Sequence, residues 1–538
     1  MTVSEATGAS RREGGRGSRD WARGRRLGFW AIAEDEPQRG ALILPDGERR
    51  TFGELAALAH RIAHGLRALG LRSGDCVALL AGNSELFYAA SLAAQETGLY
   101  IVPLNWHLAP REIAHVIADS EARALIAEAE FADAARAAAD AAALPDSHRF
   151  AVPAAPGFRA LGELLAGQPE TAPAGRTQGL VMMYTSGTTG KPKGVRRPLP
   201  AIDPTRAAEE STVFARAFGL RPFDGVQLVV GPLYHAGPSA FSWGSLHVGH
   251  TQVLTTQFDA EDLLRKIDRY RITNTHLVAT MFHRLLALPE EVKRRYDLSS
   301  LRMVVHSAAP TPIDVKKRML DWWGPVIWET YGGTEGAATI AKPHHWLAKP
   351  GTVGRAVRGV KIHVLDGEGA LCPPGTPGAI YLEIEGSQFE YWKDPEKTRG
   401  VHRGRTFTLG DVGYVDADGF LFLTGRQSEV IISGGVNIYP AEVEAELLSH
   451  PSVGDVAVIG VPNAEWGEEV KAVVQLADAV DASERLAQEL IAFCRSRIAH
   501  YKCPRSVDFR AELPRAENGK LYKRRIRDEY WRESGREI

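Results

Sequence analysis

The stretch Tyr184-Thr-Ser-Gly-Thr-Thr-Gly-Lys-Pro-Lys-Gly194 directly follows the apolar run Leu180 to Met183 and is the most informative part of this 538-residue chain. Its glycines let the backbone fold back so that successive N–H groups point at one anion. Threonine and serine hydroxyls add hydrogen-bond donors, and two lysines add positive charge. This combination predicts a loop that holds the phosphates of a nucleoside triphosphate.

The loop is not a Walker A loop. That pattern requires Gly five positions before Gly190, where Thr185 stands, and Ser or Thr after the lysine, where Pro192 stands. Pro192 also disfavours a helix that continues straight through the loop. The alternative is a surface turn rich in Gly, Thr and Lys, and ten residues of restricted type after a strand-like run argue against it.

The loop resembles the phosphate loop of the adenylate-forming superfamily, which includes acyl- and aryl-CoA synthetases, luciferases and peptide-synthetase adenylation domains. Over about residues 28 to 530 the chain resembles bacterial fatty-acid-type, AMP-forming acyl-CoA synthetases. The resemblance implies ATP, Mg²⁺ and coenzyme A as cofactors. The loop residues it implies for nucleotide binding are Thr185, Ser186, Gly187, Thr188, Thr189, Gly190, Lys191 and Lys193.

The composition is that of a globular chain, with 44% hydrophobic residues, 24% charged residues and a net charge of −2. A balance this close to neutral gives no single-sign field for a nucleic-acid or membrane partner. The four cysteines lack zinc or redox spacing, which favours a reducing compartment. No apolar window reaches about 18 residues and the start lacks a signal-peptide core. We therefore expect a cytoplasmic protein without an integral membrane segment.

Patterning divides the chain into a tail and two domains. Residues 1 to 27 are rich in Arg, Gly and Ser and are predicted to form a disordered tail. Residues 28 to 425 alternate strand-like and helical runs, which predicts an α/β adenylation domain with mostly parallel strands. Its part from about 351 to 425 has Gly, Asp and Pro turns and is predicted to be a β-rich subdomain. Residues 426 to 538 are predicted to form a small, mobile α+β domain.

Individual elements follow from spacing and capping. Thr51-Phe-Gly-Glu54 forms a capping box before leucines and an isoleucine at helical spacing, which predicts a core-facing helix. The Ala-rich segment 128 to 143 is predicted to be a surface helix, and Pro440 the first residue of another. Predicted strands are Val77 to Leu80, Ala124 to Ile126, Gln227 to Val230, Thr275 to Val278, Arg302 to Val305, Val360 to Leu365 and Ala379 to Glu385; predicted helices are Glu261 to Tyr270 and Met281 to Leu288.

A second motif, Tyr331-Gly-Gly-Thr-Glu-Gly336, resembles the superfamily segment that binds the α-phosphate through Thr334 and Mg²⁺ through Glu335. A carboxylate suits this task because Mg²⁺ takes hard oxygen ligands and shares them with substrate phosphates. Without the other motifs, Glu335 would be read as a solvated loop residue. The resemblance assigns nucleotide contacts here to Glu329, Thr330, Tyr331, Gly332, Gly333 and Thr334.

Two further segments resemble nucleoside-binding blocks. Asp411, in Thr408-Leu-Gly-Asp411, matches the aspartate that accepts hydrogen bonds from both ribose hydroxyls, and Arg426 matches its partner. Leu409 stands where most relatives have Thr, but the aspartate needs only its two acceptor oxygens. Ser307, Ala308 and Ala309 match the segment that packs on adenine, where small side chains leave room for a flat base.

Lys520, in Asn518-Gly-Lys520, resembles the lysine that serves adenylation. A carboxylate that attacks the α-phosphate brings negative charge onto negative charge, and an ammonium near the attacking and bridging oxygens offsets this. By itself, a lysine in a basic tail would be solvated. The segment from Ile431 to Glu442 resembles the lining of the CoA channel, with Ser433, Gly434 and Gly435 as the contact residues. Ser428 occupies the expected pivot between domains, where relatives carry Asp or Lys.

Gly231-Pro-Leu-Tyr-His-Ala-Gly237 resembles the acyl-CoA synthetase form of a third block, whose histidine, here His235, lies near the substrate carboxylate. Amino-acid-activating relatives have an Asp nearby, so the expected substrate is a small carboxylic acid without an amine. The prediction is an acyl-CoA ligase that makes an acyl-adenylate and transfers the acyl group to CoA. A fatty acid is the expected substrate.

Several alternatives stay open. An aryl- or steroid-acid CoA ligase fits the same motifs, and an amino-acid-adenylating domain would be expected to precede a carrier domain. A non-catalytic acyl-adenylate or nucleotide-binding protein is the alternative of a different class, with Ser428 as its single hint. The sequence leaves the acid and the oligomeric state, a homodimer included, undecided.

Overall fold

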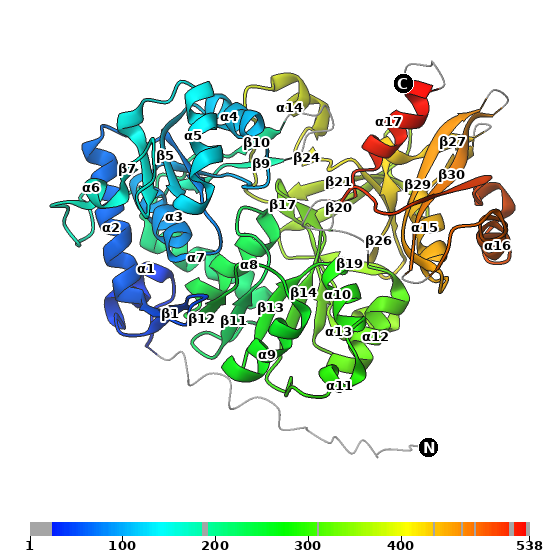
Figure 1. Cartoon of the computed structure of the whole chain (residues 1–538), viewed down its shortest axis with the longest axis horizontal. Helices are drawn as coiled ribbons and strands as arrows, with labels where there is room; N and C mark the ends of the chain where they lie inside the picture. Colours follow the sequence, from blue (N-terminus) through cyan, green and yellow to red (C-terminus); the bar gives the residue numbers. More distant parts are fainter. Residues whose placement is uncertain are drawn as a thin grey trace, which may run out of the picture.

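A computed structural model describes residues 24–185, 192–308, 311–433, 436–463, 466–477, 480–515 and 521–533. In Figure 1 the N-terminal helices and strands lie at one side and the β-rich part in the middle, and helices α15 to α17 lie with their strands at the other side. Ser186, Gly187, Thr188, Thr189, Gly190, Lys191, Ala309, Gly434, Gly435 and Lys520 lie outside the described residues.

The first parallel sheet carries the runs predicted near residues 227, 275 and 302. Neighbouring strands pair in parallel, except that β1 and β2 form an antiparallel edge. The strand order is β15 (Ile327–Glu329), β14 (Met303–His306), β13 (Asn274–Leu277), β11 (Val226–Val229), β12 (Thr251–Leu254), β1 (Gly40–Ile43) and β2 (Arg49–Thr51).

A second sheet is parallel throughout. Its central strands read as continuous apolar runs because both faces are covered. The order is β7 (Arg159–Ala160), β6 (Arg149–Val152), β5 (Ala122–Glu128), β3 (Cys76–Leu80), β4 (Tyr100–Pro103) and β8 (Leu180–Val181). The predicted parallel α/β architecture is therefore confirmed.

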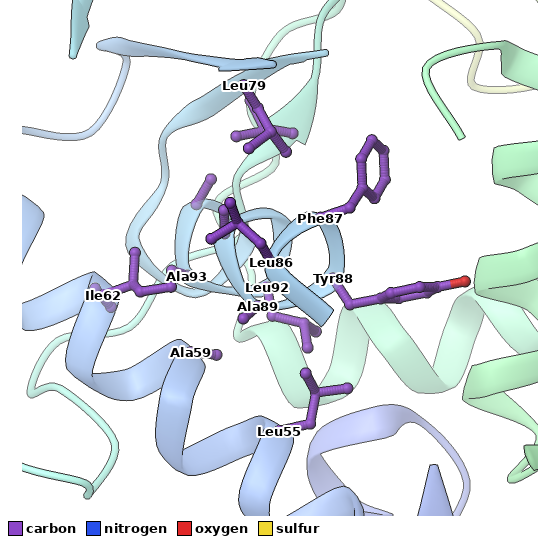
Figure 2. Packing of buried hydrophobic residues seen from close by; sticks show 14 of the residues in the cluster. Leu55, Ala59, Ile62, Leu79, Leu86, Phe87, Tyr88, Ala89, Leu92 and Ala93 are labelled. Carbon is purple, nitrogen blue, oxygen red and sulfur yellow. The ribbon is translucent and has the colours of Figure 1, made fainter. Parts of the chain in front are cut away.

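Helices α2 (Phe52–Ala68) and α3 (Glu85–Thr97) contribute to one core cluster with residues of both parallel sheets. Thr51 and Glu54 form the predicted capping box at the start of α2. Figure 2 shows Leu55, Ala59 and Ile62 of α2 facing the buried side chains of α3, with the Tyr88 ring extending away from α2. The Tyr88 hydroxyl reaches Ser242 at 2.6 Å, which ties α3 to α8 (Ala236–His247).

Antiparallel strands form the middle of the molecule, as the turn-rich sequence predicts. The largest of these sheets contains β18 (Thr339–Ile340), β19 (Thr352–Ala356), β26 (Leu421–Arg426), β25 (Asp411–Val415), β21 (Gly378–Ile384), β24 (Thr406–Phe407), β23 (His402–Arg403) and β20 (Val360–Leu365). Two smaller units are β22 (Glu390–Tyr391) with β10 (Lys193–Arg196) and β9 (Met183–Thr185), and β16 (Gly332–Gly333) with β17 (Gly336–Ala337).

The C-terminal strands form a separate sheet with its own apolar clusters. Pro440 is the first residue of α15 (Pro440–Leu448), as predicted. The sheet contains β28 (Val436–Ile438), β27 (Ile431–Ser433), β30 (Gly467–Leu476), β29 (Val453–Asn463) and β31 (Ser506–Arg510), and α16 (Glu484–Arg495) and α17 (Lys523–Glu533) complete this part.

The remaining helices connect and cover the strands. They are α1 (Phe29–Asp35), α4 (Pro110–Asp119), α5 (Ala132–Ala141), α6 (Leu161–Leu165), α7 (Pro204–Ala217), α9 (Ala260–Tyr270), α10 (Ala279–Leu286), α11 (Glu290–Lys293), α12 (Ile313–Trp323), α13 (Pro343–Ala348) and α14 (Pro395–Val401). No helix in the described ranges is both long and apolar enough to cross a membrane.

The surface helix predicted near residues 128 to 143 is present as α5, which begins at Ala132 because β5 extends to Glu128. Ala135, Ala138 and Ala139 are buried, since their small side chains let the helix pack closely. Within the predicted tail, Arg25 pairs with Glu36 at 2.5 Å.

Leu55 offers a test of the packing between α2 and α3, because its side chain is fully buried there. Leu55→Ala is expected to cost about 2–5 kcal/mol of unfolding free energy, since it leaves a cavity. Leu371→Ala is the matched control, because Leu371 is 68% exposed. Thermal unfolding followed by circular dichroism checks this, and an equal midpoint for both variants would contradict the packing described.

Candidate active site

The candidate site lies where the strands of the first parallel sheet end. Ser307 follows β14, Thr330 follows β15, and His235 stands between β11 and the start of α8. Ligands of open parallel sheets bind at the carboxyl ends of the strands. The residues that the sequence placed in three separate motifs therefore reach one edge of the sheet.

The described ends of the predicted phosphate loop form an antiparallel hairpin. Thr185 ends β9 and lies opposite Lys193, the first residue of β10. The Lys193 ammonium lies 3.0 Å from the carboxylate of Asp394, and Asp394 also caps the start of α14. Residues 186 to 191 lie outside the described residues, so their phosphate contacts remain a prediction.

The second motif forms a tight hairpin with Thr334 and Glu335 at its tip. Gly332 and Gly333 pair with Ala337 and Gly336. A Cβ on Gly332 would lie 2.5 Å from the Gly336 carbonyl oxygen, so glycine is required for the two strands to approach. Glu335 is 8% exposed, unlike the solvated glutamate that a Gly-rich turn suggests.

Two residues that the sequence analysis missed hold this hairpin. The Tyr391 hydroxyl donates to Glu335 Oε1 at 2.6 Å, and one Arg197 nitrogen donates to the carbonyl oxygens of Thr334 and Glu335, each at 2.8 Å. Asp394-Pro395 is a helix-start signal that could have drawn attention to this segment. No local pattern marks Arg197, because its partners lie more than a hundred residues along the chain.

Asp411 and Arg426 lie opposite each other across β25 and β26, and their side chains pair at 3.1 Å. The Tyr331 hydroxyl donates to the other Asp411 oxygen at 2.7 Å. Burial raises the pKa of Asp411, and the Arg426 charge and the Tyr331 bond oppose that shift. The structure thus brings together three residues that were predicted to contact the nucleoside.

A continuous set of contacts joins these parts. Asp411 contacts Tyr331, which leads directly into the Glu335 hairpin, and Glu335 contacts Tyr391. Tyr391 lies on β22, which pairs with β10, the strand that Lys193 begins. The predicted phosphate, metal and ribose residues therefore share one region.

Glu329 differs from its neighbours because its carboxylate points into the protein. It accepts from the Lys316 ammonium at 2.5 Å and lies 3.3 Å from His306. Burial opposes ionisation, yet the Lys316 charge, with a smaller contribution from His306, outweighs it and lowers the pKa of Glu329 to about 2. The next residue, Thr330, donates its hydroxyl to the Thr339 carbonyl at 2.7 Å.

A group of histidines lines the sheet edge beside α8. His276 Nε2 lies 2.9 Å from the Ser307 hydroxyl, and a Cβ on Gly237 would lie 3.1 Å from the same nitrogen. Burial lowers the pKa of His276 to about 3, with smaller contributions from His306 and His235. Ala308, next to Ser307, has a φ of 76°, a strained value for a non-glycine residue of the kind that clusters at functional sites.

Ser433 ends β27 in the C-terminal part, on the strand that was predicted to line the CoA channel. Gly434, Gly435 and Lys520 are not among the described residues, so their roles stay predictions. Leu521 forms a bridge with Arg515, and the segment that contains Lys520 lies between them.

The donor set at Glu335 fits Mg²⁺. The Tyr391 hydroxyl donates to Oε1, and no hydrogen bond from a described residue reaches Oε2. Mg²⁺ takes one or two protein carboxylates and completes its shell with phosphate oxygens and water. The described parts of the chain contain no group of three or more His, Cys, Asp and Glu arranged as a complete metal site.

Comparison with known proteins identifies the family. A family model for AMP-binding enzymes matches residues 29–392, and one for the AMP-binding enzyme C-terminal domain matches residues 442–520. The chain belongs to the AMP-binding enzyme family. The predicted resemblance to AMP-forming acyl-CoA synthetases is thereby confirmed, and ATP, Mg²⁺ and CoA are the small molecules that this enzyme class uses.

Relatives of this AMP-binding enzyme align along nearly its whole length. The feruloyl-CoA synthase of Amycolatopsis sp. is 36% identical and aligns over 93% of this chain and 98% of its own. The long-chain-fatty-acid–CoA ligase FadD13 of Mycobacterium tuberculosis is 32% identical over 92% and 96%. The solved anthranilate CoA ligase AuaEII, in complex with anthranoyl-AMP, superposes with a TM-score of 0.83 at 27% identity over 95% and 99%.

The pH dependence of this AMP-binding enzyme tests the state of His235. Burial and the nearby His107 lower the pKa of His235 to about 4, below the ordinary value of about 6.5. His235 therefore stays neutral down to about that pH, and we expect kcat/KM for the acid to show no fall caused by His235 protonation between about pH 8 and 5.5. A fall in kcat/KM below about pH 6.5 in the wild type that is absent in His235→Asn would contradict this expectation.

Proposed function

We propose that this enzyme activates an aromatic carboxylic acid with ATP and transfers the acyl group to CoA. The observation that carries the reaction class is the continuous set of contacts from Asp411 through Glu335 to Lys193. It supports one nucleotide with its ribose at Asp411 and its phosphates between Glu335 and Lys193. Cationic and hydrogen-bonding groups placed in this way favour charge that develops on the phosphates.

The proposed reaction has two steps. An oxygen of the acid's carboxylate attacks the α-phosphorus, and the bond from that phosphorus to the pyrophosphate oxygen breaks. The CoA thiol then attacks the acyl carbon, loses its proton, and AMP leaves with the oxygen that came from the acid. Bound Mg²⁺ would neutralise phosphate charge at Glu335, Thr334 would bond the α-phosphate, and Lys520 would offset charge on the attacking and bridging oxygens.

The second step is proposed to use a different face of the C-terminal domain, residues 426 to 538. A rotation of that domain would move Lys520 away and bring Ser433, Gly434 and Gly435 to the site. His235 is proposed to lie near the acid's carboxylate as a neutral hydrogen-bonding group. We also propose that the enzyme is located in the cytoplasm.

An aromatic acid is favoured by the polar wall beside α8. His276 Nε2 and the half-buried Ser307 hydroxyl lie there together, 2.9 Å apart. A hydroxyl on an aromatic ring could hydrogen-bond to the Ser307 hydroxyl, whereas an alkyl chain offers it no partner. The likeness to the feruloyl-CoA synthase and to the solved anthranilate CoA ligase supports the same choice.

A fatty acid, the substrate expected from the sequence, is the second candidate. A cavity of about 350 Å³ lies along the later turns of α8, lined in part by Phe214, Ala240 and Gly244. Such apolar walls suit an alkyl tail. The likeness to FadD13 favours this candidate as well.

A panel of free acids separates the two candidates. We expect CoA thioesters, detected by mass spectrometry, from hydroxylated aromatic acids such as cinnamic acid derivatives, with kcat/KM at least about 10-fold above that for fatty acids. His276→Leu is expected to narrow that ratio, since it removes the polar group. A preference for long alkyl acids that His276→Leu leaves unchanged would contradict the aromatic assignment.

Lys520→Ala tests the proposed catalytic lysine. We expect acid-dependent pyrophosphate release to fall by about 10²-fold or more while ATP still binds, because the ammonium acts on charge that develops during the reaction. Arg524→Ala is the control, since the Arg524 side chain is 64% exposed. Turnover at the wild-type rate in Lys520→Ala, or no turnover with any acid in the wild type, would contradict the proposal.

A further inference from the structure

The Glu335 carboxylate has no support from its own hairpin. Glycines flank the tip on both sides, and the carboxylate lies so close over the backbone that a Cβ on Gly333 would be 2.6 Å from Oε2. A glutamate on such a turn would ordinarily sample several rotamers, because no described residue of the hairpin donates a hydrogen bond to its carboxylate. Whatever orients it must come from elsewhere in the chain.

Tyr391 supplies the side-chain contact. Its hydroxyl donates to Oε1 at 2.6 Å, and the residue is 5% exposed among the residues of the β-rich core. The Tyr391 backbone is fixed by pairing with Val195 and by its N–H, which donates to the Thr398 hydroxyl at 3.0 Å.

Arg197 supplies the backbone contact. One guanidinium nitrogen donates to the carbonyls of both tip residues, and the Arg197 carbonyl itself accepts from the Tyr100 hydroxyl at 2.6 Å. Among the described residues no carboxylate lies within ion-pair distance of Arg197, so the hairpin is the polar partner of its side chain. The tip is therefore held at its backbone by one residue and at its side chain by another.

We propose that Tyr391 and Arg197 are positioning residues that fix Glu335 so that its free Oε2 binds the metal ion of the metal–nucleotide complex. The proposal rests on the proposed function only in placing that complex at Glu335. Groups that orient a ligating carboxylate typically change metal affinity by about 10–100-fold when they are removed. Neither residue is required to touch the acid or the nucleotide.

The test measures metal affinity in the full-length enzyme. Mn²⁺ is titrated in the presence of α,β-methylene ATP, and free Mn²⁺ is followed by electron paramagnetic resonance. Tyr391→Phe keeps the ring and removes the hydroxyl, so we expect the Mn²⁺ dissociation constant to rise about 10-fold. Binding of the analogue without metal and the thermal midpoint are expected to stay at wild-type values, and excess Mg²⁺ is expected to restore turnover.

Tyr381→Phe is the matched control. Tyr381 is also a buried tyrosine, on β21 of the neighbouring sheet, and its hydroxyl makes no hydrogen bond within the part of the chain that the structure describes. This variant is expected to bind Mn²⁺ as the wild type does. Arg197→Met is expected to weaken Mn²⁺ binding, and Arg197→Lys to retain part of the affinity, because an ammonium still donates.

Unchanged Mn²⁺ affinity in both Tyr391→Phe and Arg197→Met would overturn the proposal. It would also be overturned if metal-free analogue binding and the thermal midpoint fell in parallel, since that pattern marks a purely structural role. Failure of the proposed function looks different. The wild type would then bind Mn²⁺ and the analogue, and the variants would weaken that binding, yet no acid would trigger pyrophosphate release.

Discussion

The site depends on one constraint: the carboxylate of Glu335 must be buried and still present a free oxygen. An ionised carboxylate is costly to bury unless hydrogen bonds and opposite charge compensate it. The Tyr391 hydroxyl donates to one carboxylate oxygen, and an Arg197 nitrogen donates to the backbone carbonyls of Thr334 and Glu335. The Lys397 ammonium lies 3.9 Å from the centroid of the Tyr391 ring. Residues from two distant segments, Arg197 and the stretch from Tyr391 to Lys397, surround this group and leave the second oxygen for a ligand.

Charge is distributed unevenly around this constraint. Lys193, Arg197 and Arg426 lie on the side assigned to the nucleotide, whereas the histidines beside α8 are kept neutral by burial. ATP and an ionised acid repel each other, so cations are useful where the phosphates bind. A neutral wall beside the acyl group suits an apolar or aromatic body. The buried pair of Lys316 and Glu329 is a structural ion pair beneath this edge.

The sequence predicted the parts of the fold that local patterns encode. Strand runs near residues 77, 227, 275 and 302, the capped helix after Thr51 and the Pro440 helix start are all confirmed, because periodicity and capping are local properties. The Ala-rich segment forms the predicted helix α5, but the sequence did not show which face is buried, because alanine suits both exposed and closely packed helix faces. The motifs identified Glu335, Asp411 and Arg426 as site residues. They did not identify Tyr391 or Arg197, because the roles of these two residues arise from pairing between β22 and β10 and from contacts between segments far apart in the chain.

The central claim is that Glu335 Oε2 binds the metal that accompanies the nucleotide phosphates. A crystal structure with Mn²⁺ and α,β-methylene ATP tests it most directly, through the anomalous signal of the metal. The account predicts an anomalous peak at about 2.0–2.3 Å from Oε2, shared with a phosphate oxygen, and a ribose within hydrogen-bonding distance of Asp411. Metal and nucleotide bound elsewhere, with Oε2 unliganded, would contradict it.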